Sequence, residues 1–512
     1  MTEPSVSFQT RLLHSSSAAR SDVSAQASFQ PLLSLIKTNC QRYPYLLASS
    51  AITQSNTQFD ILLAFPQFTL RLDADKKLFK TTCLDGCDQD GGNDREELDG
   101  TDGFLAALDV LYQNEKKAVC QNPQNYPFTG GWFIYLAYEM AAEIEPCLSL
   151  PELPAGQPLA VASRCPAAVI VDKKNQQIIA IAESGYAYLL DEIEQDFRSL
   201  SDPSPSADCA AKQAIKLESL SEAETGPYLE QVESIKRYII DGDIFQANLS
   251  RQWRARLKHE VADADLFYAL AKQNPSSFAA LACLDTMSII SSSPERLVSI
   301  RQGVVETRPI AGTRPRDENS TSDAALAKEL LEHPKEQAEH IMLIDLERND
   351  LGRVCRPGSI EVNELMALES WEHVHHIVSN VRGELLPDKT AIDVIRAVFP
   401  GGTITGCPKV RCMEILAEKE QQARGAYTGS LGYLNNDGSM DLNILIRTMV
   451  RDKSGATGEK VELTFRAGGG IVSDSIAENE LAETRAKAKG LLKIFDPVTE
   501  DNESGQSRQG DG

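Results

Sequence analysis

Phe399-Pro-Gly-Gly-Thr-Ile-Thr-Gly-Cys-Pro-Lys-Val-Arg-Cys-Met-Glu-Ile-Leu416 is the stretch around which the chain is organised. The pattern predicts a strand over 394–399, and the glycine pair at 401–402 then allows positive φ and a close approach of bare backbone. Pro408 suits the first turn of a following helix, whose free N–H groups point back at the loop. With Lys409 beside them, these groups favour an anionic ligand. The alternative is a tight turn from strand to helix that binds nothing.

The overall composition limits how such an anion can be held. The chain has 512 residues, with 42% hydrophobic and 24% charged residues, which is typical of a soluble globular protein of two domains or of one large domain with an insertion. Its net charge is −23, from 51 basic and 74 acidic residues. This balance argues against a broad nucleic-acid surface, because phosphates would be repelled. Positive charge at a binding site must therefore be local.

No apolar segment suggests a membrane span or a secretion signal, so we expect a cytoplasmic protein. The eleven cysteines show no paired C-x-x-C spacing, which predicts buried free thiols in a reducing cytosol. Cys83 and Cys87 are a weak metal candidate, because no second pair lies nearby. Residues 88–91 resemble part of a calcium loop, but Gly86 takes the first ligand position, so we expect a solvated loop.

Composition and periodicity divide the chain into five parts. We expect a disordered tail over 1–28, an N-terminal domain over 29–200, a linker over 201–226, a catalytic domain over 227–495 and a disordered tail over 496–512. Within these parts the pattern predicts strands at 59–65 and 68–72, a buried strand at 130–138, a hairpin of 167–171 with 178–181, and helices at 104–112, 228–240 and 334–350.

Two pairs of acidic residues indicate a metal site. Glu336 and Glu339 are three residues apart and would share one face of the 334–350 helix, and Glu480 and Glu483 repeat this spacing near the C-terminus. Two helices that each offer carboxylates can hold Mg²⁺, which needs few protein oxygens and completes its shell with water and ligand. The alternative for each pair is a solvated helix face.

The sequence His373-Val-His-His-Ile-Val378 is a further candidate. On a strand, His373 and His375 would share one face and His376 the other. Because His376 begins an apolar pair, we expect it near the interior. It is either a buried histidine with its hydrogen bonds satisfied or a general acid beside a departing hydroxyl.

These features occur together with six further motifs, namely 242–251, 292–296, 308–316, 424–427, 446–447 and 468–472. In combination they resemble the chorismate-utilising enzyme family, densely over 228–490 and more loosely over 30–190. The resemblance implies an α+β fold in which antiparallel sheets flanked by helices form two subdomains around a deep cleft. It also implies that the cleft binds one chorismate and one Mg²⁺.

The resemblance assigns a role to each matching residue. Glu339 and Glu483 would be the metal ligands, with Glu336 and Glu480 beside them. Glu295 would be the acid/base group, and His376 would lie by the ring hydroxyl that leaves. The substrate-binding set would comprise Tyr427 and Arg447 on the enolpyruvyl carboxylate, Gly468 and Gly469 through their backbone, Lys409 as a further cation, and Ala311, Gly312, Thr313 and Thr403 around the ring.

Gln246 indicates which nucleophile attacks the chorismate ring. Members of the family that hydroxylate chorismate carry a lysine at this position, which activates water, whereas neutral glutamine cannot. We therefore expect ammonia as the nucleophile. Ammonia-using members pair with a glutaminase subunit, so the resemblance implies a class I glutamine amidotransferase as partner.

The product is less firmly indicated. The segments Gln246-Ala-Asn-Leu, Pro400–Gly406 and Gly468-Gly-Gly look like aminodeoxychorismate synthase component I, which makes 4-amino-4-deoxychorismate for p-aminobenzoate and folate biosynthesis. Ala311, however, stands where many such enzymes carry a lysine that attacks the ring, and alanine is the anthranilate-type residue. Anthranilate synthase component I is therefore the alternative, and a non-catalytic chorismate-binding regulatory subunit is a remote third possibility.

The N-terminal half offers one more candidate site. Tyr45-Leu-Leu-Ala-Ser49 resembles the Leu-Leu-Glu-Ser element of the family's tryptophan pocket, with Ala48 in place of the glutamate. Ser49 is the residue of this candidate pocket. Strong feedback inhibition by tryptophan is not expected, and either a retained structural site or none remains open.

Overall fold

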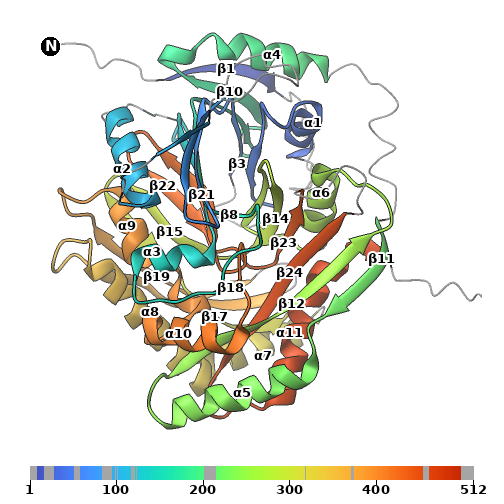
Figure 1. The fold of residues 1–512 in the computed structure, drawn as a ribbon, viewed down its shortest axis with the longest axis vertical. Coiled ribbons are helices and arrows are strands. Elements are labelled where there is room, and N and C mark those ends of the chain that lie inside the picture. Colours follow the sequence, from blue (N-terminus) through green and yellow to red (C-terminus); the bar gives the residue numbers. More distant parts are fainter. Residues whose placement is uncertain are drawn as a thin grey trace, which may run out of the picture.

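The computed structural model describes residues 8–15, 28–50, 58–83, 95–98, 100, 102–116, 122, 124–200, 215–317, 319–370, 374–453 and 461–496. In this part of the chain, two large and mostly antiparallel sheets pack against each other, and helices cover their outer faces and one end (Figure 1). The predicted fold class, antiparallel sheets flanked by helices, is confirmed.

The first sheet has neighbouring strands that run antiparallel, apart from its last pair, which is parallel. Its order is β1 (Phe8–Ser15), β10 (Gln177–Glu183), β9 (Ala167–Asp172), β3 (Phe59–Ala64), β2 (Tyr45–Ala48), β13 (Phe278–Cys283), β14 (Met287–Ser293), β23 (Thr448–Asp452), β24 (Glu462–Ile471), β12 (Gln246–Leu257), β11 (Ile215–Glu222) and β25 (Phe495–Asp496), with β20 (Gly406–Cys407) paired to the start of β12.

The second sheet is antiparallel throughout. Its order is β17 (Ile310–Pro315), β19 (Val374–Glu384), β16 (Val304–Thr307), β15 (Arg296–Arg301), β22 (Met440–Asn443), β21 (Ser430–Asn435), β7 (Gly131–Leu136), β8 (Pro158–Cys165), β4 (Phe68–Asp73), β5 (Leu78–Thr82) and β6 (Arg95–Glu97), with β18 (Glu361–Ser370) paired to β19.

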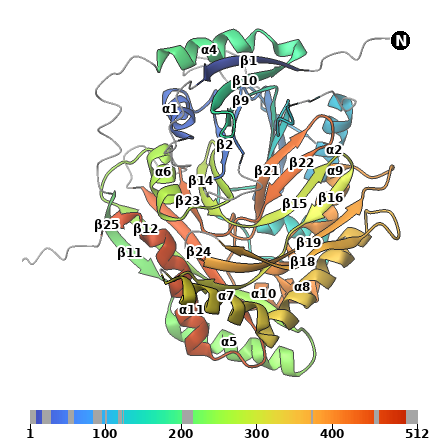
Figure 2. The same ribbon diagram turned by 180° about the vertical axis from the view of Figure 1, so that it is seen from behind.

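The helices surround these sheets, as the two opposite views show (Figures 1 and 2). α4 (Leu189–Ser199) covers β1 and β10 at one end, and α5 (Thr225–Ile240) lies at the other end beside α11 (Ala477–Leu492). The remaining helices are α1 (Gln30–Thr38), α2 (Phe104–Glu115), α3 (Ala141–Ile144), α6 (Asp263–Gln273), α7 (Ser320–Glu332), α8 (Pro334–Gly352), α9 (Ala391–Val398) and α10 (Lys409–Glu420).

The core lies between the facing sheets. Apolar side chains alternate inward along the strands, and Tyr45 of β2 stacks on Phe133 of β7 with ring centroids 3.8 Å apart. β7 is buried along its whole length because both of its faces are covered. A second cluster fills the space between the first sheet and α1, α4, α6 and α11.

Most predicted elements are present. The strands predicted at 59–65, 68–72 and 130–138 are β3, β4 and β7, and the predicted hairpin is β9 with β10. The helices predicted at 104–112, 228–240 and 334–350 are α2, α5 and α8. Their types could be predicted from short apolar runs for the strands and, for α8, from Pro334 in the first turn.

The segment before the glycine pair was interpreted wrongly. Residues 394–399 belong to helix α9, which begins with a capping box formed by Thr390 and Asp393. Gly401 has φ −57° and not the expected positive value. It is needed for space, because an added Cβ would lie 2.7 Å from Ile444 Cδ1. The close approach therefore involves the core and not a ligand.

The predicted boundaries also require correction. The predicted tail over 1–28 contains β1, whose residues pair with β10, and the predicted linker over 201–226 contains β11. Residues 84–94, which include Cys87 and the calcium-like run, lie outside the described residues. No helix in the described ranges is long and apolar enough to cross a membrane.

Candidate active site

A cavity of about 610 Å³ opens between α8 and α11. Its remaining walls come from β12, β17, β24 and the turn Gly402–Ile404 (η4). Twelve of the residues selected from the sequence line it, namely Gln246, Glu295, Ala311, Gly312, Glu336, Glu339, Thr403, Tyr427, Arg447, Gly468, Glu480 and Glu483. The fold thus gathers, into one cavity, side chains that are up to 237 positions apart in the sequence, Gln246 and Glu483 being the extremes.

One end of the cavity is suited to a carboxylate. The Arg447 guanidinium makes no hydrogen bond or ion pair within the described ranges, and burial lowers its pKa. Its φ of +50° is in the left-handed region, which costs a non-glycine residue roughly 1–2 kcal/mol. Gly468 leaves room here, since an added Cβ would lie 2.7 Å from the Tyr427 hydroxyl and 2.8 Å from Asn248 Oδ1. A guanidinium without a hydrogen bond or ion pair in the described residues, in a cavity that the Tyr427 phenol also lines, favours an anionic ligand.

Glu295 is the group in this cavity best suited to proton exchange. The Thr403 hydroxyl donates a 2.5 Å hydrogen bond to its Oε1. Burial raises the pKa of Glu295 to about 7, although Thr403 and the positive charges of Lys487 and Arg447 act to lower it. A carboxyl group with a pKa near neutrality can both give and accept a proton.

His376 lies behind the cavity wall and not among its lining residues. Its Nδ1 is 3.3 Å from the carbonyl oxygen of Gly312, so an Nδ1–H donates there and Nε2 carries the lone pair. Burial, and then the charge of Arg447, lower the pKa of His376 to about 4. The imidazole is therefore neutral at pH 7 and in this state is no proton donor at Nε2.

The four acidic residues of the predicted metal site all line the cavity. Glu339 accepts a hydrogen bond from Gln246 Nε2 (2.9 Å), and Glu483 pairs with Lys487 (2.8 Å). Glu480 accepts a hydrogen bond from Ser475 (2.7 Å).

The oxygens of Glu480 and Glu483 converge on one backbone position. A Cβ added at Gly469 would lie 3.1 Å from Glu480 Oε2 and 3.6 Å from Glu483 Oε1. Within the described ranges, no three histidine, cysteine or acidic side chains are grouped closely enough to enclose a metal ion. Mg²⁺ needs only one or two protein carboxylates, with water and ligand oxygens as the others. Glu339 and Glu483 would each offer one carboxylate to such an ion, in exchange for their present partners Gln246 and Lys487.

Lys409 does not reach the cavity. Its Nζ lies 2.5 Å from Asp350 and donates to the carbonyl of Val398 at 3.1 Å, so its charge is already matched. The predicted role of Lys409 in holding the substrate has no support from this position. Thr313 pairs with His376 across β17 and β19, and its side chain lies outside the described set, as does His373.

Ser49 lines a different cavity, of about 170 Å³, together with Leu47, Ala48 and residues of β13 and β21. Its backbone N–H donates to Asp60 at 2.9 Å. The cavity beside the segment predicted to resemble a tryptophan pocket shares no lining residue with the larger cavity.

Sequence reasoning gave no site role to four polar residues that line the larger cavity, Asn248, Arg314, Arg466 and Lys487. Lys487 follows Glu483 by four residues on α11, a spacing that could have indicated the ion pair. Arg466 directly precedes the Ala-Gly-Gly-Gly run of β24. Nothing local in the sequence shows that its side chain reaches the cavity wall.

Residues 63–493 match the family model described as chorismate binding enzyme, so the chain belongs to this family. It is 42% identical over 379 residues to an anthranilate synthase component I-like protein of Synechocystis, covering 73% of this chain and 74% of that protein. It is 47% identical over 270 residues to aminodeoxychorismate synthase component 1 of Bacillus subtilis, covering 52% of this chain and 55%, about half, of that protein.

Solved structures agree with this assignment. Anthranilate synthase component I from Streptococcus pneumoniae is 32% identical, with a TM-score of 0.72, covering 86% of this chain and 93% of that chain. The menaquinone-specific isochorismate synthase from Escherichia coli, at 16% identity and a TM-score of 0.65, shares the fold. The chain is thus a chorismate-utilising enzyme of the type to which anthranilate synthase component I and aminodeoxychorismate synthase belong.

Proposed function

We propose that the protein aminates chorismate with ammonia to 4-amino-4-deoxychorismate, as an aminodeoxychorismate synthase component I. The observation that carries this proposal is the pair Gln246 and Asn248, two neutral amides of β12 in the cavity wall. Anthranilate synthases more often have valine where this chain has Asn248. A residue that separates the two enzyme types by sequence thus lies where it can contact the substrate.

Gln246 supports ammonia and not water as the nucleophile. Its Nε2 already donates to Glu339, and a neutral amide cannot remove a proton from water. Ammonia has its own lone pair and needs no such base to attack the ring. In the reaction a C–N bond forms, the C–O bond to the ring hydroxyl breaks, and that hydroxyl leaves as water. A class I glutaminase subunit would supply the ammonia.

The other cavity residues have roles consistent with this chemistry. Arg447 and Tyr427 hold the enolpyruvyl carboxylate, and Glu295, with its pKa near 7, carries the proton that the departing hydroxyl requires. Glu339 and Glu483 would hold Mg²⁺, which, when bound, offsets the charge of a substrate carboxylate.

Anthranilate synthase component I is the second candidate, and Ala311 favours it. Ala311 is buried in the cavity wall on β17 and has no nucleophilic atom, so it cannot form a covalent adduct with the ring. Ammonia must then add directly. If elimination of pyruvate follows, the ring becomes aromatic and the product is anthranilate.

Product analysis decides between the candidates. With chorismate, Mg²⁺ and ammonium, we expect chromatography to show 4-amino-4-deoxychorismate, which an added lyase converts to p-aminobenzoate, with anthranilate as a minor product. Ala311→Lys should preserve or raise that share. Mainly anthranilate and pyruvate from the unmodified protein would establish the second candidate, and no consumption of chorismate by folded protein would favour a silent regulatory subunit.

A further inference from the structure

Two buried arginines share one buried carboxylate beside the cavity. Glu420, at the end of α10, lies 2.8 Å from Arg424 Nη2 and 3.1 Å from Arg466 Nη2. Its Oε1 also accepts hydrogen bonds from the backbone N–H and the hydroxyl of Ser250, at 2.9 and 2.8 Å. All three charged side chains are at most 5% exposed. We refer to Arg424, Glu420 and Arg466 as the buried triad.

The buried triad carries an excess of positive charge. The two guanidinium groups outweigh burial and lower the pKa of Glu420, so this carboxylate is ionised. Two cations then face one anion. Another buried carboxyl group nearby, Glu139, accepts hydrogen bonds from the backbone N–H groups of Arg424 and Gly425. Burial raises the pKa of Glu139 to about 7, so at neutral pH it offsets at most part of this charge.

The buried triad is fixed to the cavity wall. Arg466 is itself a lining residue. Arg424 donates to the carbonyl oxygens of Asn248 (2.6 Å) and Ile404 (3.3 Å), both of which belong to lining residues. Its guanidinium also lies 5.7 Å from the ring centroid of Tyr427. The positive charge of the buried triad thus lies next to the part of the cavity wall that Tyr427 and Gly468 form.

We propose that this unmatched charge strengthens the binding of the anionic substrate, and that Arg466 is an affinity-determining residue of the enzyme. The proposal rests on the use of chorismate, a dianion, but not on which product forms. Water cannot screen a charge buried in the protein wall, so this charge acts on a ligand in the cavity more strongly than an exposed arginine would. Arg466 needs no direct contact with the ligand for this effect.

The experiment measures the dissociation constant of chorismate by isothermal titration calorimetry, in Mg²⁺ buffer without ammonium. Arg466→Gln removes the charge but keeps a hydrogen-bond donor for Ser250 and Glu420. We expect this substitution to raise the dissociation constant about tenfold. Arg466→Lys retains the charge and should stay within about threefold of the wild type. The KM for ammonium, an uncharged nucleophile once deprotonated, should be unchanged in Arg466→Gln.

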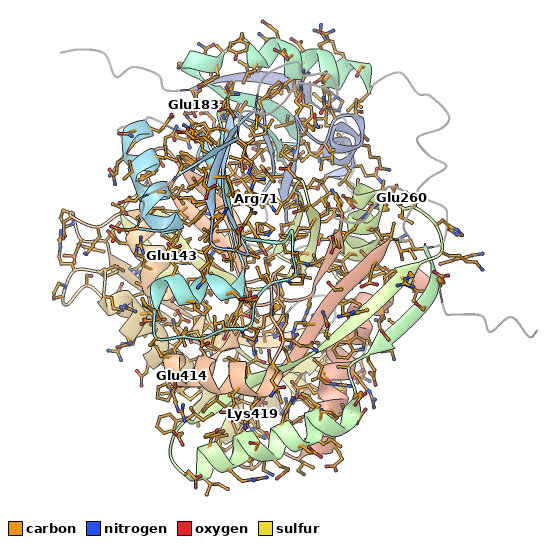
Figure 3. The ribbon with its side chains drawn as sticks, viewed as in Figure 1. Arg71, Glu143, Glu183, Glu260, Glu414 and Lys419 are labelled. Atoms are coloured by element: carbon orange, nitrogen blue, oxygen red, sulfur yellow. The ribbon has the colours of Figure 1, made fainter. Side chains whose placement is uncertain are left out.

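A matched control separates affinity from stability. Arg164 on β8 is another buried arginine between two carboxylates, 2.9 Å from Glu115 and 2.7 Å from Glu183. It lies far from the buried triad, because Figure 3 shows Glu183 near one end of the molecule and Lys419, the neighbour of Glu420, near the other. Arg164→Gln should lower the melting temperature and leave the affinity for chorismate unchanged.

Folded Arg466→Gln that binds chorismate as the wild type does would overturn the proposal. Should this variant fail to fold, Arg466→Met takes its place, because methionine fills a similar volume without polar atoms. A raised dissociation constant for chorismate in Arg466→Met would support the proposal, and an unchanged one would overturn it. A loss of affinity in Arg466→Lys as large as in Arg466→Gln would also contradict it, because it would show that geometry and not charge matters. A wild-type protein that does not bind chorismate would overturn the assigned substrate itself.

Discussion

At the residue scale, the burial of Glu295 makes the stability of the fold depend on pH. In the unfolded chain its carboxyl has an ordinary pKa of 4.5, and in the folded protein burial raises this pKa to about 7. The folded state therefore binds the proton more tightly. The stability of the fold falls as the pH rises from 4.5 to 7, because the buried carboxyl must then lose its proton.

Glu295→Gln should therefore stabilise the protein under alkaline conditions while removing activity. Above pH 7 we expect a gain of about 3 kcal/mol in the free energy of unfolding, and no gain below pH 4.5. Turnover should fall roughly a hundredfold or more, because the acid/base group is lost. Melting temperatures of both proteins at pH 5 and pH 8 give the comparison. Equal stabilities at pH 8 would show that Glu295 is not strained by burial.

Glu339 and Glu483 define the second prediction at this scale. Each should supply one oxygen to Mg²⁺, so Glu339→Gln and Glu483→Gln should each lower turnover roughly a hundredfold or more and weaken Mg²⁺ binding measured by calorimetry. Glu478→Gln, an exposed position on the same helix as Glu483, is the control and should change neither quantity. Full activity of either active-site variant in the presence of a chelator would contradict the metal assignment.

His376 illustrates what residue-level reasoning from sequence could not supply. The pattern His-His-Ile-Val correctly indicated a buried position, since His376 is 5% exposed. The sequence left open whether His376 is a satisfied buried histidine or a general acid, and in the structure burial and Arg447 lower the pKa of His376 to about 4. Arg447 lies 71 residues further along the chain, so its influence has no local trace in the sequence. Burial raises the pKa of Glu295 to about 7, so this carboxyl group is partly protonated at neutral pH.

At the scale of elements, a buried ion pair joins α8 to α10. Lys409 at the start of α10 pairs with Asp350 near the end of α8, and the two side chains are 13% and 5% exposed. Glu347, one turn before Asp350, is also buried, and burial together with the charge of Asp350 raises the pKa of Glu347 to about 8. Lys409 is thus the cation that keeps this acidic cluster stable between two helices.

Lys409→Met should consequently destabilise the fold by about 3–5 kcal/mol, because it leaves a buried carboxylate without a partner. Chorismate affinity should stay within about threefold of the wild type, since Lys409 does not line the cavity. Arg356→Met is the control, because Arg356 and Glu384 form an exposed pair that contributes about 1 kcal/mol or less. Denaturant unfolding and calorimetry provide the two measurements. A large loss of affinity in a folded Lys409→Met variant would restore the substrate-binding role predicted from the sequence.

Elements could be predicted where a start signal was clear, as for α8 with Pro334 in its first turn, and could not where a short apolar run was ambiguous. The run Val394–Phe399 fits a strand or a buried helix equally well. Thr390 and Asp393, which form the capping box of α9, were the signal that favoured a helix. β1 was missed because an edge strand within a polar segment has little pattern of its own, and only its pairing with β10 defines it.

At the scale of the whole molecule, the segments predicted as two domains are interleaved in both sheets. β2 pairs with β13, and β7 pairs with β21, so each sheet contains strands from before residue 200 and after residue 215. The stacked rings of Tyr45 and Phe133 then join the two sheets to each other. Pairings across such distances in the sequence leave no local signature, which is why composition suggested a simple division at the linker.

The interleaving predicts that residues 215–512 do not fold alone. Without the N-terminal segment, β13 loses β2 and β21 loses β7, so two central strands become edges and their apolar faces are exposed. We expect this fragment to aggregate or to show no cooperative unfolding, and not to bind chorismate. Coexpressed with residues 1–200, it should assemble and bind chorismate, because β2 can then pair with β13 and β7 with β21. Circular dichroism and calorimetry on the fragment and on the reassembled pair provide the comparison. If 215–512 alone unfolds cooperatively and binds chorismate, the catalytic half is an independent domain and the shared sheets are dispensable.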